Sequence, residues 1–283
     1  MNPLRTRFIN YMVLRGLSSH TQAAYLRVVT ALAKHYQRSP DQLSNDEIQA
    51  FLVHVISERK LAWNSVNVYF WAIRCFYQKV LHRDSSHFHI PPRGRARRRP
   101  VVLSRQAVER ILLGTTNIKH QALLAMVYGS GLRVSEVCRL RPSHIESAPD
   151  RMMVRIEQGK GHKDRYTLLS EKALDTLRTY WRAYRPGEWL FAAPGTCQPL
   201  STRSAQRIYD QACERVGIVE AHGIHSLRHA FATHLVENGV QLVLIKQWMG
   251  HRSIVTTAGY CHLAREYGPM VKSPLDVPFQ ARA

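Results

Sequence analysis

The chain has 283 residues, and its hydrophobic residues, at 45%, are numerous enough for a packed core, which excludes an intrinsically disordered protein. Its 40 lysines and arginines outnumber its 20 aspartates and glutamates, giving a formal net charge of +20 with histidine neutral. Because such a charge repels itself without a polyanionic partner, nucleic acid is the first expectation, with an acidic membrane or an acidic protein as alternatives.

Neither export nor membrane insertion is indicated by the sequence. The first residues, "MNPLRTRFINYMVLRG", are interrupted by charges and do not form a secretory signal. No window approaches the roughly 18 uninterrupted apolar residues of a membrane-spanning helix. The 5 cysteines are scattered and form no CxxC pair, which favours neither a disulfide framework nor a zinc site. We therefore expect a soluble, cytoplasmic protein.

Residues 1–83 are expected to contain helices only. Apolar residues at helical spacing predict helices over residues 18–36, 44–56 and 64–81. The second of these begins with Ser44 and Glu47, the spacing of a capping box. Because the helices are short and close together in sequence, they indicate a compact bundle.

Residues 84–100 are expected to be a basic linker. They contain prolines and an arginine run and have neither a helical nor a strand period. A run of arginines is commonly a solvated tail, but between two folded parts of a basic protein it favours contact with the DNA backbone. The arginines concerned are Arg93, Arg95, Arg97, Arg98 and Arg99.

Residues 101–267 are expected to form a larger, α-rich domain with a small antiparallel sheet, followed by a tail over 268–283. The two ends of residues 151–170 favour strands and the glycine-rich middle favours a turn, which together predict a β-hairpin. The fold class is therefore mainly α, or α+β. Helices are predicted over residues 104–113, 119–131, 133–140, 170–184, 201–217, 225–238 and 241–249.

Two segments of the second domain place charged groups near glycines. In "GSGLRVSEV", Arg133 and Glu136 lie three residues apart as a helix begins. They could serve a site or could form an ordinary surface ion pair. In "GKGHKDR", Lys160 lies between two glycines at the tip of the hairpin, either reaching a ligand or pointing into solvent.

Two further segments carry polar groups among apolar ones. In "HSLRHAFATHL", His225 and Arg228 share a helical face, and no carboxylate lies at the spacing that would pair with this arginine. In "MGHRSIVTTAGYCH", His251 follows a helix-ending glycine and Tyr260 follows nine positions later. Taken alone, this tyrosine could be an ordinary half-buried side chain.

Together, the four segments would make a site rich in hydrogen-bond donors, with a phenol as its obvious nucleophile. Arginine suits the planar, bidentate recognition of phosphate oxygens. The sequence offers no carboxylate cluster typical of Mg²⁺, no Cys/His set typical of Zn²⁺ and no Walker loop. Such a site could stabilise the extra charge of a pentacoordinate phosphorane.

At this point the sequence resembles the tyrosine recombinases, also called the phage integrase family. The run "HSLRHAFATHLVENGVQLVLIKQWMGHRSIVTTAGYCH" resembles their C-terminal box, "GSGLRVSEV" their arginine box and "GKGHKDR" their lysine hairpin. The order, spacing and two-domain plan match over about residues 5–265 and are most similar to the Xer-like branch. The resemblance implies a SAM-like core-binding domain at residues 1–83 and a catalytic domain at residues 101–267.

The resemblance also implies DNA cleavage and rejoining through a 3′-phosphotyrosine, with strands exchanged between two sites in integration, excision, transposition or dimer resolution. The implied partners are double-stranded DNA and other subunits, in a homotetramer or a Xer-like hetero-tetramer, and no cofactor or metal is implied. A type IB topoisomerase, or a relative that binds DNA without chemistry, is the alternative. The implied roles are Tyr260 as nucleophile, Arg133, Arg228 and His251 as phosphate ligands, Lys160 as general acid, His225 as base or hydrogen-bonding partner, Glu136 as a brace, and Lys163 as a DNA contact.

Three positions depart from the pattern of the family. Met249 stands where leucine is usual, Cys261 where threonine is frequent, and Gly223-Ile224 where a proline often precedes the histidine. None of these departures removes a catalytic group, so we expect them to affect local packing only.

Overall fold

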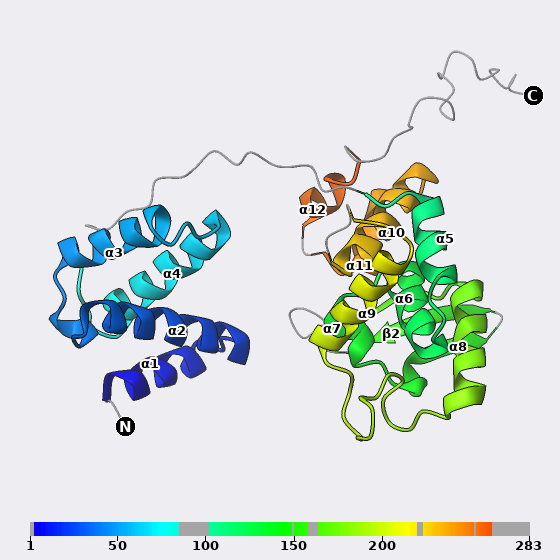
Figure 1. The fold of residues 1–283 in the computed structure, drawn as a ribbon, viewed down its shortest axis with the longest axis horizontal. Helices are drawn as coiled ribbons and strands as arrows, with labels where there is room; N and C mark the ends of the chain where they lie inside the picture. Colours follow the sequence, from blue (N-terminus) through cyan, green and yellow to red (C-terminus); the bar gives the residue numbers. More distant parts are fainter. Residues whose placement is uncertain are drawn as a thin grey trace, which may run out of the picture. The chain divides into compact units, whose positions relative to one another are not determined.

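The computed structural model describes residues 3–84, 102–148, 150–157, 164–219, 223–251 and 253–261. The chain divides into two compact units, Met1–Ala96 and Arg97–Ala283 (Figure 1). Among the described residues, helices dominate both units and one small antiparallel sheet lies in the second, so the expected fold class is confirmed. Except for Asp84, the predicted linker lies outside the described residues.

The first unit is a bundle of helices, coloured blue to cyan in Figure 1. The helices predicted near residues 18–36, 44–56 and 64–81 are confirmed, and α2 packs against α4. The capping box of Ser44 and Glu47 forms as expected. Helix α1 was not predicted, although Phe8 and Met12, one helical turn apart, are both buried. The bounds are α1 Pro3–Leu14, α2 Ser19–Tyr36, the 3₁₀ turn η1 Pro40–Gln42, α3 Asn45–Ser57 and α4 Trp63–Lys79.

The first unit has its own aromatic core. The rings of Phe8 and Phe76 meet edge to face with 5.2 Å between their centroids. Phe51 and Tyr77 are also fully buried, and the Tyr77 hydroxyl donates a hydrogen bond to the carbonyl of Pro40. Because this core is built from all four helices, it fixes them relative to one another.

Helix α6 (Ile118–Ser130) is the central helix of the second unit. It is apolar almost all round, and Leu123, Leu124 and Met126 have no exposed surface, as expected of a helix enclosed by others. The helices packed against it include α5 (Arg105–Leu113), α8 (Glu171–Tyr184), α9 (Thr202–Arg215) and α10 (His225–Glu237), as Figure 1 shows.

The sheet has three antiparallel strands in the order β1-β2-β3, and the predicted hairpin is its second pair. The strands are β1 (Ile145–Ala148), β2 (Arg151–Ile156) and β3 (Arg165–Leu168). Strand β1 was not predicted, because it is short and carries Glu146 and Ser147 at its centre. Pairing of Ile156 with Arg165 places this arginine at the start of β3. The tip of the hairpin, residues 158–163, lies outside the described residues.

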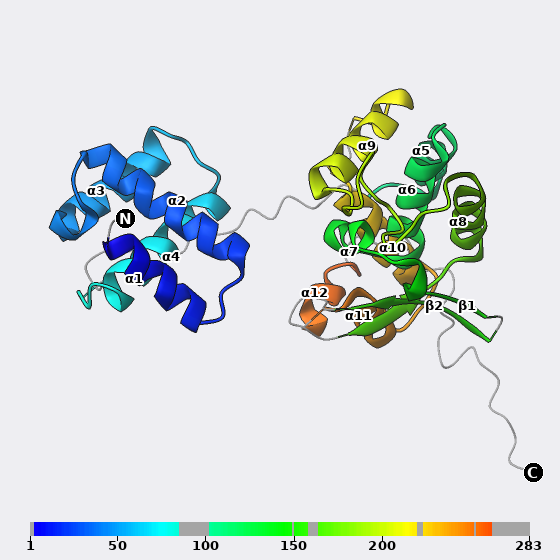
Figure 2. The same cartoon turned by 90° about the horizontal axis from the view of Figure 1, so that it is seen from below.

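Three short helices complete the second unit. They are α7 (Val134–Cys138), α11 (Leu242–Met249) and α12 (Ile254–Ala258), and a 3₁₀ turn, η2, spans Pro142–His144. Helix α11 contacts both α12 and β3, so it lies between the last helix and the sheet (Figure 2). Helix α12 was not predicted from the sequence. Throughout the described ranges, the helices are too short or too polar to cross a membrane.

Candidate active site

Two helices of the second unit end at glycines that the local structure requires. Helix α6 ends at Gly131 and helix α11 at Gly250, and both have a φ of 61°, in the left-handed region. A Cβ at Gly131 would lie 2.4 Å from the Phe231 ring, and one at Gly250 would lie 2.9 Å from the Arg165 side chain. The carbonyl oxygens of both glycines accept hydrogen bonds from arginines.

Arg228 is held by two main-chain carbonyl oxygens. Its guanidinium donates to the carbonyl of Gly131 and, over 2.5 Å, to the carbonyl of Met249. Only 5% of Arg228 is exposed. Burial, and then the positive charge of Arg133, lowers the pKa of Arg228 to about 10, so it remains charged at neutral pH. This is a buried cation bonded to carbonyl dipoles rather than to a carboxylate of its own.

Glu136 is the carboxylate at the centre of the cluster, and its side chain is only 8% exposed. It accepts from the backbone N–H of Arg133 over 2.8 Å and from Nη1 of the same residue over 2.7 Å. Arg165 binds both of its oxygens, each over 2.8 Å, in a bidentate pair. Burial opposes ionisation, but the hydrogen bonds and charges of Arg165 and Arg133 outweigh it and lower the pKa of Glu136 to about 2. A surface ion pair therefore does not describe Arg133 and Glu136.

The cluster carries more positive than negative charge. Arg133 also donates to the Gly250 carbonyl over 3.0 Å, and Arg165 to the Trp248 carbonyl over 2.9 Å. The nearest guanidinium nitrogen of Arg228 lies 3.9 Å from Glu136. Three guanidinium groups thus face one carboxylate. Because buried like charges destabilise one another unless an anion meets them, the cluster is suited to bind one.

His251 lies between the arginines and the tyrosine. Its Nε2 lies 3.5 Å from Nη2 of Arg228, and its Nδ1 is hydrogen-bonded to Thr257 Oγ1 over 2.9 Å. Burial, and then the charges of Arg228 and Arg133, lowers the pKa of His251 to about 4. The imidazole is therefore neutral at pH 7. Because a guanidinium can only donate, Nε2 accepts from Arg228 in this arrangement and the N–H lies on Nδ1, toward Thr257.

Tyr260 lies just after α12 and is buried, with 6% of its surface exposed. Its ring stacks with that of His251 at a centroid distance of 6.1 Å and an interplanar angle of 12°. Its hydroxyl is hydrogen-bonded to Nδ1 of His229 over 3.1 Å. Burial raises the pKa of Tyr260, while the charges of Arg228 and Arg133 lower it. The resting phenol is therefore protonated and lies beside cations that would stabilise its anion.

His225, at the first residue of α10, is exposed. Partial desolvation, and then the charges of Arg228 and Arg133, lowers its pKa, so it lies within the electrostatic reach of the cluster. Arg133, Glu136, Arg228, His251 and Tyr260 are thus brought together, with His225 at the edge. The remaining predicted site residues lie outside the described residues: Lys160, Lys163, Arg93, Arg95, Arg97, Arg98 and Arg99.

Comparisons with known proteins agree with this geometry. Residues 102–266 match the phage integrase family, and residues 4–87 match the N-terminal SAM-like domain of phage integrases. The chain belongs to the phage integrase family. It is a site-specific recombinase of the tyrosine type, similar to the Xer recombinases, as the sequence predicted.

Individual relatives resemble the recombinase over most of its length. The putative integrase/recombinase y4qK of Sinorhizobium fredii is 38% identical, covering 98% of this chain and 90% of that protein. The tyrosine recombinase XerA of Thermococcus kodakarensis is 29% identical, covering 94% and 93%. A crystal structure of a lambda integrase dimer bound to a COC′ core site shares the fold, with a TM-score of 0.73, 17% identity, and coverage of 96% of this chain and 80% of that one.

The structure adds two residues to which the sequence analysis gave no role. Arg165 pairs with Glu136 from the start of β3, and His229 contacts the hydroxyl of Tyr260 from α10. Arg165 follows the lysine hairpin, and His229 directly follows Arg228, so both belong to the quoted motifs. Roles were expected instead for nearby residues of these motifs. A sequence does not show which side chain contacts a partner 29 or 31 positions away.

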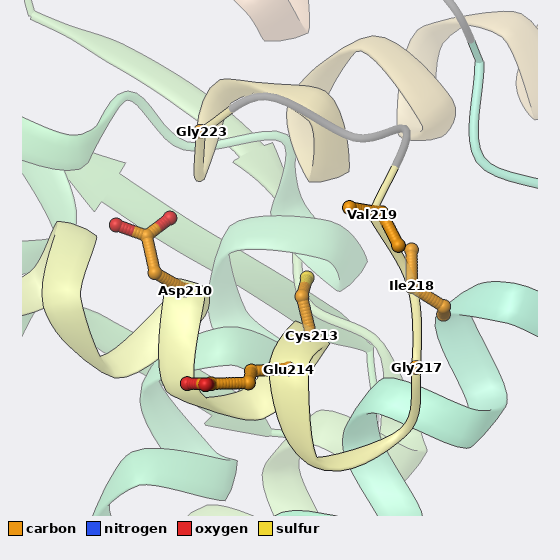
Figure 3. Close-up of a pocket in the computed structure, with 7 residues that line it drawn as sticks. All are labelled: Asp210, Cys213, Glu214, Gly217, Ile218, Val219 and Gly223. Carbon is orange, nitrogen blue, oxygen red and sulfur yellow. The ribbon is translucent and has the colours of Figure 1, made fainter.

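A cavity elsewhere in the recombinase does not suit a phosphate. It is lined by Asp210, Cys213 and Glu214 of α9 and by Gly217, Ile218, Val219 and Gly223 of the segment after it (Figure 3). Two carboxylates and no cation are among these lining residues, so the cavity would repel a DNA backbone. The positive cluster around Arg228 remains the place for the anion.

Proposed function

We propose that the recombinase cleaves and rejoins DNA through a 3′-phosphotyrosine at Tyr260 and exchanges strands between two sites. The observation that carries the proposal is a buried phenol beside three guanidinium groups that share one carboxylate. A phosphodiester is the anion that such a cluster fits, because each guanidinium presents fixed donors to phosphate oxygens.

In this mechanism the phosphate is held by Arg133, Arg228 and His251. Their donors face charge that grows as the phosphorus becomes pentacoordinate, so they stabilise the transition state more than the ground state. Glu136 acts through the arginines: it fixes the direction of Arg133 and prevents the guanidiniums from separating. With DNA bound, the tautomer of His251 that carries its proton on Nε2 donates to the phosphate, and it does so without adding charge that would repel the arginines.

The chemical step is a transesterification. The Tyr260 oxygen attacks phosphorus and the 5′ oxygen leaves, taking a proton from Lys160 as the general acid. His225, at the edge of the cluster, serves as a hydrogen-bonding partner of the phosphate. Since the phosphotyrosine bond keeps the energy of the phosphodiester, the 5′ hydroxyl of a second duplex can reverse the attack and complete the exchange.

The partners follow from charge and from the relatives. The net charge of +20 suits double-stranded DNA, and the structure of lambda integrase carries a DNA core site. We propose that residues 1–83 bind DNA, that the basic linker and Lys163 contact its backbone, and that a homotetramer or a Xer-like hetero-tetramer joins two sites. The protein would act in the cytoplasm, where DNA is accessible to it.

The experiment that tests this function has two stages. Covalent adducts captured on a library of DNA fragments identify the preferred site, and two copies of this site are then placed in direct repeat on one plasmid. Recombination yields two circles of the sizes set by the sites. Relaxation of supercoils without new circles would instead indicate a type IB topoisomerase, and binding without any adduct would indicate a relative that has lost chemistry.

Lys160→Ala is expected to cleave normal DNA slowly and to recover on a substrate with sulfur at the bridging 5′ position. Sulfur leaves readily without a proton, so the general acid becomes unnecessary. The measurement is the rate of adduct formation on both substrates, with Lys163→Ala as the matched control from the same hairpin. Rescue of Lys163→Ala in place of Lys160→Ala would reverse the assignment.

A further inference from the structure

The hydroxyl of Tyr260 is hydrogen-bonded to His229, whereas the family resemblance implies His225 as the base or hydrogen-bonding partner. His229 Nδ1 lies 3.1 Å from this hydroxyl, and the two rings have centroids 5.8 Å apart. Within the described ranges, no hydrogen bond joins His225 to Tyr260, and His225 is exposed at the start of α10. Of the two, therefore, His229 is the histidine in contact with the reacting oxygen.

The surroundings of His229 keep its imidazole neutral. Burial comes first, and the charges of His225 and Arg228 on the same helix add to it, so that the pKa of His229 is lowered from its ordinary value. His251, in the turn after α11, also interacts with it, and Tyr260 faces it from beyond α12. A neutral imidazole with its proton on Nε2 presents a lone pair on Nδ1 to the phenol.

We propose that His229 is the general base that takes the proton of Tyr260 during DNA cleavage. The inference rests on the proposed function. The O–H bond of Tyr260 breaks and an N–H bond forms at Nδ1 of His229, while the Tyr260 oxygen bonds to phosphorus and the P–O5′ bond breaks. In rejoining, the 5′ hydroxyl attacks, and the phenolate leaves and recovers the proton from His229. No proton or electron is left unassigned, because the acid protonates and deprotonates the 5′ oxygen in the same two steps.

A general base at His229 also explains how the buried phenol of Tyr260 can lose its proton. Burial raises the pKa of Tyr260, so ionisation of the free phenol is disfavoured although Arg228 and Arg133 stabilise the anion. A base within hydrogen-bond reach removes the proton only as the bond to phosphorus forms. The cations then meet a charge that moves onto the phosphate rather than a free phenolate.

The test is His229→Asn, whose amide can occupy the place of Nδ1 and bond to the phenol but cannot take its proton at neutral pH. Adduct formation on a nicked suicide substrate is measured from pH 5.5 to pH 9.5, a window chosen around the ordinary pKa of histidine, which is about 6.5. General-base catalysis contributes about 100-fold or more, so a loss of this size is expected near pH 7. His234→Asn on the same helix is the matched control, because it alters a similar pair between His234 and Tyr128, 2.9 Å apart, outside the site.

The shape of the pH profile separates a base from a packing residue. The wild type should be flat through neutrality and should slow only below the lowered pKa of His229, where the imidazole becomes protonated. His229→Asn should accelerate with rising pH, because solvent must then take the proton, so the difference narrows toward pH 9.5. A rate within threefold of the wild type at pH 7, or an equal loss at every pH, would overturn the proposal.

Control measurements distinguish a failure of the role of His229 from a failure of the proposed recombinase function. Thermal melting and DNA binding show whether each variant is folded, and His229→Gln replaces His229→Asn if the latter is not. If the wild type forms no adduct at Tyr260, the proposed function fails. If it forms the adduct and His229→Asn forms it equally fast, only the role of His229 fails.

Discussion

Tyr260→Phe is expected to fold, to bind its DNA site and to form no covalent adduct at all. The substitution removes one oxygen, whose hydrogen bond in the structure is to His229. Loss of one such bond costs about 1 kcal/mol of folding free energy, which a packed domain tolerates. DNA binding should persist, because Arg133, Arg228 and His251 keep their places. The chemistry should disappear, because the attacking atom is absent.

The measurement is mass spectrometry of the peptide bound to a nicked suicide substrate, from which the cleaved 5′ end diffuses away. Tyr128→Phe is the matched control: its hydroxyl is also hydrogen-bonded to a histidine of α10, His234, but it lies outside the cluster. This control should form the adduct at a normal rate. An adduct on Tyr166 or Tyr209, or one that persists in Tyr260→Phe, would refute the assignment of the nucleophile.

Glu136→Gln is expected to destabilise the second unit more than any other single polar substitution proposed for this site. The substitution removes the negative charge that Arg133 and Arg165 share and places an N–H₂ donor opposite their donors. Removing one partner from a buried ion pair costs about 3–5 kcal/mol, because the remaining charges stay buried without compensation. The measurement is the free energy of unfolding by urea at pH 7. Glu188→Gln is the control, since its pair with Arg141 is exposed and should contribute little.

The effect of Glu136→Gln on the free energy of unfolding is expected to depend on pH. The pKa of Glu136 is lowered from 4.5 to about 2. A lowered pKa stabilises the folded state above the unfolded value and loses this effect as the pH falls through the folded value, which corresponds to about 3 kcal/mol here. The difference between the wild type and Glu136→Gln should therefore be full above about pH 5 and shrink toward pH 2. A difference that stays constant between pH 7 and pH 3 would show that charge is not what the variant lost.

Helices and hairpin were predictable wherever the apolar pattern was long and regular. Helix α6 is apolar all round, and α3 begins with a capping box, so both were expected close to their observed bounds. Strand β1, helix α12 and helix α1 were not expected. The first two are too short to show a period, and charged residues interrupt the third.

The candidate site was predictable as a set of motifs but not as a set of contacts. Arg133 and Glu136 are near in sequence, so their pairing could be proposed from spacing alone. The bidentate partner, Arg165, depends on where β3 begins, and the contact of His229 with Tyr260 depends on how α10 and α12 pack. Tertiary packing decides such contacts, and no local pattern encodes them. The roles given to Lys160, Lys163 and the linker arginines stay predictions, because those residues lie outside the described ranges.

The departure at Met249 has a simple structural explanation. Its side chain is fully buried, while its carbonyl oxygen accepts the hydrogen bond from Arg228. Leucine and methionine have similar volumes, so one can replace the other in the core without moving this oxygen. The family pattern at this position is therefore a packing preference rather than a chemical requirement.

The oxygens of Gly131, Trp248, Met249 and Gly250 that hold the three arginines belong to the main chain. No codon change can delete a carbonyl, so the alignment of these guanidiniums depends on the shape of two turns as well as on the carboxylate of Glu136. The turns themselves are the vulnerable part, since one added methyl group at Gly131 or Gly250 would meet a side chain already in place.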